Sequence, residues 1–109
     1  MKMPDMRRLL LLTVLVGLLG SKWEGRPIVA RTLESTPYSE TDAILLVEVV
    51  DGVLPEDLLG KTMFYELPGV AGHAEARIFL AQPSGFNIRI HISIRTGSAP
   101  VVGGGAIII

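Results

Sequence analysis

The chain has 109 residues, a length that predicts one small domain, and 49% of them are apolar, which excludes a disordered chain. From residue 22 onward it carries 7 basic and 10 acidic residues, a net charge of −3, so it lacks the clustered positive charge that a nucleic-acid-binding protein needs. There is no cysteine, which excludes disulfides, iron–sulfur sites and a thiol nucleophile.

An apolar run occupies residues 9–20, directly after the basic pair Arg7–Arg8. Its length suits the core of a signal peptide, about 7–15 residues, better than a transmembrane helix of about 20. The basic pair stays on the inner side, which places the rest of the protein outside the cytoplasmic membrane. No cleavage site of the A-x-A type follows, and Trp23 suits an aromatic anchor at a membrane interface.

We therefore expect residues 1–21 to form an apolar helix that serves as a signal peptide or a short membrane anchor. A buried helix of a cytosolic fold is the third, less favoured interpretation. The protein is predicted to be exported, to a periplasmic, extracellular or virion location, and either secreted or membrane-anchored.

Residues 22–109 are predicted to be a single β-domain, because β-branched and aromatic clusters alternate there with Gly and Pro. The predicted strands are residues 28–33, 43–50, 62–67, 75–81, 86–95 and 101–109, with one helical turn at 55–57. This pattern favours an all-β fold, a small antiparallel β-sandwich that is Ig-like or related.

The segment NIRIHISIR, residues 87–95, alternates strictly between polar and isoleucine residues. It predicts an antiparallel strand with its isoleucines in the core and Arg89, His91 and Arg95 on the other face. Pro83 and Gly85 predict a tight turn before it, so residues 76–95 are expected to form a hairpin. An earlier segment, AILLVEVV at 43–50, is apolar except for Glu48 and predicts a central strand covered on both faces.

The C-terminal tail combines three glycines, residues 103–105, with three isoleucines, Ile107, Ile108 and Ile109. Such an apolar end needs a partner surface, while the glycines are read as a hinge. The sequence leaves two arrangements open. The tail either closes the domain as its last strand or completes a neighbouring chain by strand addition.

The metal-binding residue types do not form a known motif. His73, Glu75 and His91 are not spaced as a metal motif, and the acidic residues Glu40, Asp42 and Asp51 lack the D-x-D-x-D pattern of a calcium loop. We expect no metal and no cofactor.

Catalytic motifs are absent as well. Ser84 lies in the predicted hairpin turn and not in a G-x-S-x-G nucleophile elbow. The glycines at 103–105 lack the Lys and Ser or Thr of a phosphate loop, and the adjacent Glu56 and Asp57 are typical of solvated loop charge. The sequence therefore predicts a protein that is not an enzyme, with no catalytic residues.

Two groups of residues are candidates for partner binding. One is the polar stripe formed by Arg77, Arg89, His91 and Arg95, and the other is the tail, Ile107 to Ile109. We expect a non-enzymatic structural or interaction module of a cell-envelope, filament or virion assembly, joined to its partners through β-strand contacts. Its partners are expected to be proteins, including copies of itself, with membrane contact through residues 9–20 and no nucleic acid. The alternative is a monomeric exported ligand-binding or inhibitor domain.

Overall fold

The computed structural model describes residues 25–109, so the predicted signal or anchor at 1–21 lies outside the described residues. Residues 25–109 confirm the all-β prediction. Their elements are β1 (Pro27–Pro37), β2 (Asp42–Val49), α2 (Pro55–Leu58), β3 (Thr62–Tyr65), β4 (Ala74–Ser84), β5 (Asn87–Thr96) and β6 (Gly105–Ile108). No helix among these residues is long and apolar enough to span a membrane.

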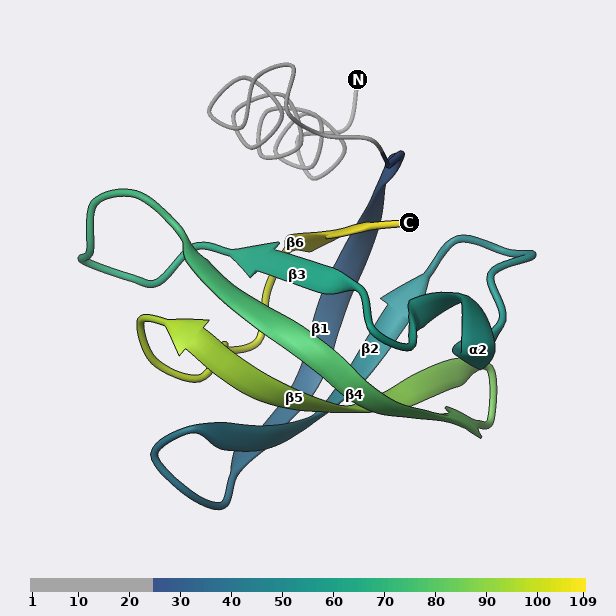
Figure 1. Cartoon of the computed structure of the whole chain (residues 1–109), viewed down its shortest axis with the longest axis horizontal. Helices are drawn as coiled ribbons and strands as arrows, with labels where there is room; N and C mark the ends of the chain where they lie inside the picture. Colours follow the sequence, from purple (N-terminus) through teal and green to yellow (C-terminus); the bar gives the residue numbers. More distant parts are fainter. Residues whose placement is uncertain (1–24) are drawn as a thin grey trace.

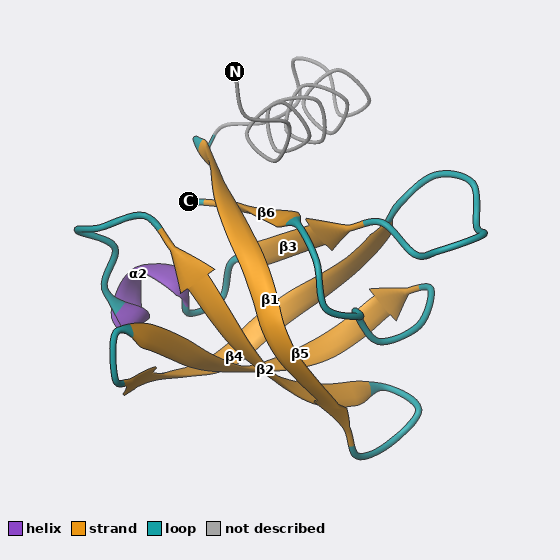
Figure 2. Ribbon diagram, turned by 180° about the vertical axis from the view of Figure 1, so that it is seen from behind, coloured by secondary structure: helices purple, strands orange, loops and turns teal. Residues whose placement is uncertain are grey.

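The six strands form one closed antiparallel barrel in the order β1-β2-β5-β4-β3-β6 (Figures 1 and 2). Strands β3, β4 and β5 follow one another as neighbours, and β6 returns to lie beside β3, which is a Greek-key arrangement. The predicted sandwich is thus replaced by a barrel. The reason is that β6 pairs with both β3 and β1, which joins what would have been the two free edges of the sheet.

The hairpin of β4 and β5 agrees with the sequence prediction. Ile88, Ile90 and Ile92 are buried in the barrel, while Arg89 is exposed and His91 lies half-buried on the outer face. Gly85 has a φ of 64°, the left-handed conformation that the predicted turn requires.

Strand β2 departs from its prediction, because only one of its faces is covered. Ala43, Leu45 and Val47 point into the barrel and are fully buried, whereas Ile44 and Leu46 lie half-buried on the outside. In a barrel each strand has one inner face, and β2 packs mainly against its neighbours β1 and β5. The expectation of a strand covered on both faces is therefore wrong.

The C-terminal tail docks within its own chain. Ile107 is fully buried as part of β6, between β1 and β3. Gly105 has no room for a side chain, since a Cβ there would lie 2.9 Å from the Phe64 carbonyl oxygen. Gly103 exchanges two backbone hydrogen bonds with Thr32, at 2.7 and 3.0 Å. Gly105 thus allows close backbone contact, and Gly103 has a φ of 150°, a conformation that residues with a side chain rarely adopt. The predicted hinge is therefore a fixed part of the fold.

The two ends of the barrel carry different connections. We call one of them the entry end, because the described part of the chain enters the barrel there at Gly25. This end also holds the connection that contains α2 and the turn between β4 and β5, and the C-terminus lies there beside Arg26. The opposite end, the loop end, holds the loops at 38–41, 66–73 and 97–104, on the left in Figure 1.

Helix α2 closes the entry end. Pro55 begins it, and the Asp57 carboxylate accepts a hydrogen bond from the Leu54 backbone N–H at 2.9 Å. Leu58 is fully buried and belongs to the core cluster, while Leu54 and Leu59 on either side of the helix are exposed. The short helix therefore fills the barrel with one leucine and presents two others to the outside.

Candidate interaction surface

The outer wall formed by β2, β5 and β4 carries the polar stripe that the sequence predicts. Arg89 and Arg95 are exposed on β5, and His91 lies between them on the same face. Arg77 on β4 pairs with Ser93, which follows His91 by two residues on β5 and so lies on the same face. The structure thus brings the four stripe residues onto one wall.

A β-bulge adds an apolar group to this wall. Ile78 pairs with Ile92 and Leu80 pairs with His91, so Phe79 has no partner in the register. Because a bulge re-aims the strand, Phe79 and Leu80 both face outward, with 47% and 38% of their surface exposed. Simple alternation would have buried Leu80, which is why sequence reasoning missed it.

Phe79 contacts a residue of the stripe. Its ring lies edge-on to the His91 ring, with centroids 6.0 Å apart and planes at 73°. Across the strands, Leu80, His91 and Ile44 occupy one row of the register. We call the surface made by Ile44, Phe79, Leu80, Arg89 and His91 the wall patch.

The wall patch lies beside arginines that are not engaged in ion pairs within the described part of the chain. Among residues 25–109, Arg77, Arg89 and Arg95 form no ion pair, whereas Arg31 and Glu48 pair at 3.3 Å on the neighbouring part of the wall. Residues 25–109 as a whole carry a net negative charge. Asp42, which pairs with Ser93, and Glu75 face outward on the same wall, so its charges are mixed. The patch itself combines three apolar side chains with Arg89 and His91, a composition enriched where proteins bind one another.

The tail residues lie apart from this wall. Ile107 and Ile108 are buried, and the Ile109 backbone exchanges two hydrogen bonds with Arg26, at 2.8 and 2.9 Å. In one direction around the barrel, β3 and β4 lie between β6 and β5. In the other direction, β1 and β2 lie between them. The structure does not bring the two candidate groups together.

The two histidines also remain apart. The His73 ring packs against Phe64, with centroids 5.4 Å apart, while His91 packs against Phe79. Within the described part of the chain, no three His, Asp or Glu side chains gather as a metal ion would require.

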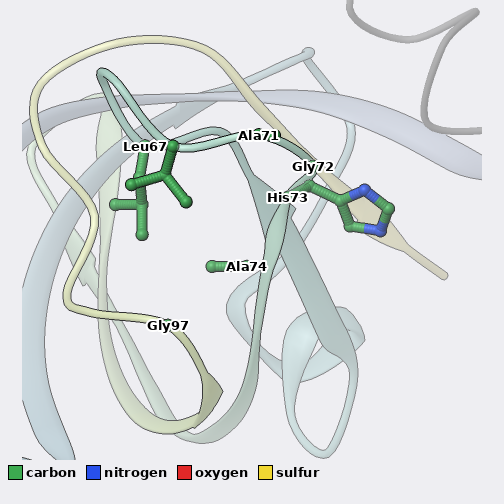
Figure 3. A pocket seen from close by; sticks show the side chains of 7 residues that line it. Leu67, Ala71, Gly72, His73, Ala74 and Gly97 are labelled. Carbon is green, nitrogen blue, oxygen red and sulfur yellow. The ribbon is translucent and has the colours of Figure 1, made fainter.

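A small pocket of about 190 Å³ lies at the loop end of the barrel. Its lining is mostly apolar, and Figure 3 shows the His73 ring directed away from Leu67, Ala74 and Gly97. Pockets for drug-sized ligands have volumes of about 300–1,000 Å³ and several convergent polar groups. This pocket offers neither feature, so it lends little support to a ligand-binding role.

Tyr65 fixes the loop beside this pocket. Its side chain is buried, and its hydroxyl donates a hydrogen bond to the Ser98 carbonyl oxygen at 2.7 Å. Burial raises the pKa of Tyr65 from 10.0 to about 12, because the phenolate loses hydration in the protein.

This pKa shift predicts a loss of stability at high pH. The folded state holds the Tyr65 proton more tightly than the unfolded state, so the contribution is complete below pH 10 and is lost as the pH rises through 12. Denaturant unfolding at pH 8, 10, 11 and 12 measures it. Tyr65→Phe is the control and should show a smaller decrease over this range. Equal decreases in both proteins would contradict the prediction.

No protein-family model matches the chain, and no curated protein matches it in sequence.

Proposed function

We propose that this protein is a non-enzymatic interaction module of an exported assembly, in a cell envelope, filament or virion. Its partner contact is the wall patch. The observation that carries the proposal is the bulge at Phe79, which turns Leu80 outward next to Phe79 and so places two large apolar side chains beside Arg89 and His91. Aromatic residues and arginine supply most of the binding free energy at protein interfaces.

Because the barrel is closed, we place the partner contact on its outer wall and not at a strand edge. Strand addition requires an unpaired edge strand, and the tail that was its candidate is paired on both sides as β6. The wall patch, in contrast, has an apolar centre beside Arg89. We infer a partner surface that is apolar and carries a carboxylate opposite Arg89, because Arg89 forms no ion pair among residues 25–109.

The alternative is a monomeric exported ligand-binding or inhibitor domain, and the 190 Å³ pocket is a feature of residues 25–109 that supports ligand binding. Its small volume makes this function the weaker of the two.

Photo-crosslinking tests the proposal in the organism that makes the protein. A photoreactive amino acid in place of Phe79, in the full chain, is expected to yield one discrete protein adduct. An adduct of twice the chain mass identifies a second copy as the partner. The matched control is the same probe at Val70, which is exposed at the loop end of the barrel and should give no adduct.

A second variant tests the charge of the interface. Arg89→Ser in the crosslinking chain should reduce the adduct yield, by about fivefold or more if this arginine contributes about 1 kcal/mol. Equal adducts from positions 79 and 70, or no adduct from position 79, would contradict an interface at the wall patch.

A further inference from the structure

Four exposed apolar side chains gather at the entry end of the barrel. Val50, Leu54 and Leu59 come from the connection that contains α2, and Phe86 stands at the tip of the β4–β5 turn with its side chain fully exposed. None of the four belongs to the hydrophobic core, and Leu58 is the residue of α2 that packs into the core. Exposed apolar residues on neighbouring loops at one end of a domain mark a contact surface.

The barrel topology places these loops together although they are distant in sequence. In an antiparallel barrel, β2 and β4 end where β3 and β5 begin, so the two connections share one end. Figure 1 shows α2 and the β4–β5 turn next to each other on the right side of the barrel. Helix α2 and β4 are also in contact.

The N-terminal part of the sequence enters the barrel at this same end. Gly25 precedes β1, and four residues separate it from Gly20, the last residue of the apolar run. Five residue steps span about 18 Å at full extension. If the run lies in a membrane, the entry end cannot stand farther from the bilayer than this length.

We propose that the entry end rests on the surface of a lipid bilayer, with Phe86, Leu54, Leu59 and Val50 among the lipid headgroups. Apolar residues of this kind bind a peripheral protein to the boundary between headgroups and acyl chains. The inference goes beyond the proposed function and rests on the expected membrane contact of residues 9–20. It implies that the wall patch, on the side of the barrel, faces a partner beside the membrane.

The charges at the entry end indicate which lipids suit it. Among the described residues, Asp51 and Glu56 are exposed there, Arg26 is an exposed cation and Lys61 is half-buried. Acidic side chains are repelled by anionic lipids, whereas zwitterionic headgroups impose no such cost. We therefore infer a surface of phosphatidylcholine or phosphatidylethanolamine type.

The loop end supplies matched controls. Val70 and Val102 are as exposed as the leucines of the entry end, but they lie at the other end of the barrel. If exposure alone led to lipid contact, both ends would behave alike. The proposal requires that only the entry end contacts lipid.

Site-directed spin labelling distinguishes these outcomes, because the chain has no cysteine of its own. The full-length variants Phe86→Cys and Leu59→Cys, with Val70→Cys and Val102→Cys as controls, are labelled and reconstituted in phosphatidylcholine vesicles. Accessibility to a water-soluble nickel chelate should fall about tenfold at positions 86 and 59 when vesicles are present, the factor expected from burial of one large apolar side chain. Labels at 70 and 102 should remain accessible.

Several results would overturn the proposal. Equal accessibility at all four positions, or a full chain that does not float with the vesicles, means that the entry end does not touch lipid. Protection of position 86 without vesicles means that residues 1–24 cover it, or a second copy if the protection grows with protein concentration. A requirement for anionic lipid would contradict the inferred headgroup type. Neither the Phe79 crosslink nor its Val70 control depends on any of these results.

Discussion

Deletion of residues 103–109 is expected to abolish the folded state. These residues form β6, which joins β1 to β3 and closes the barrel. Two buried isoleucines are lost, at about 1.5–3 kcal/mol each, and the strands on both sides lose their backbone partners. A domain of this size has a free energy of unfolding of only about 4–13 kcal/mol, so the remaining chain has little or no stability left.

Circular dichroism and thermal unfolding of the truncated chain measure this effect. The control is the double variant Val101→Ser and Val102→Ser, because both side chains are exposed just before the tail and should leave the melting temperature nearly unchanged. A truncated chain that still unfolds cooperatively would show that β6 is dispensable. If it were also monomeric while the intact protein is oligomeric, the tail would act between chains.

The second large effect is expected from Ile90→Asp. Ile90 is fully buried in β5, opposite Leu45 on one side and Ala81 on the other. A carboxylate at this position has no partner within the apolar interior, and its burial costs several kcal/mol. The variant should therefore be largely unfolded at neutral pH.

Two neighbouring changes make this prediction specific. Ile90→Val removes one methylene and should lower the free energy of unfolding by only about 0.5–1.5 kcal/mol. Arg89→Ser alters the adjacent exposed residue and should change it by no more than about 0.5 kcal/mol. Chemical denaturation of the three variants measures the differences. If Ile90→Asp and Arg89→Ser lowered the free energy of unfolding by similar amounts, Ile90 would not face the core and Arg89 would not face solvent as described.

Local patterns in the sequence were sufficient for the individual elements. The alternation at 87–95 determines the facing of β5, since a strand repeats every two residues. Gly85 determines the turn before it, and Pro55 with the acidic residues after it marks the start of α2. Each signal acts within a few residues of the chain, so it can be read without knowledge of the fold.

The candidate surface was only partly readable in the same way. Alternation placed Arg89, His91 and Arg95 on one face, and the hairpin register added Arg77. Leu80 was not found, because its exposure depends on a bulge whose position is set by how β4 pairs with β5. Phe79 faces outward by simple alternation as well, but its place in a patch with Leu80 and His91 follows from that pairing. Ile44 was expected to be covered because a continuous apolar run resembles a strand buried on both faces.

The sequence by itself determined that residues 25–109 form an all-β fold, where most of its strands lie and which residues of β5 face the core. Only the tertiary structure decided that the strands close into a barrel and that the tail belongs to its own chain. The physical reason is that closure depends on long-range pairing, β6 with β1 and with β3, across up to about 80 residues of sequence. Alternation is the same in a sandwich and in a barrel, because each strand in either fold has one inner face. The partner of each edge is therefore fixed by packing and register, as at Gly105, where the close approach of β3 to β6 leaves space for no side chain.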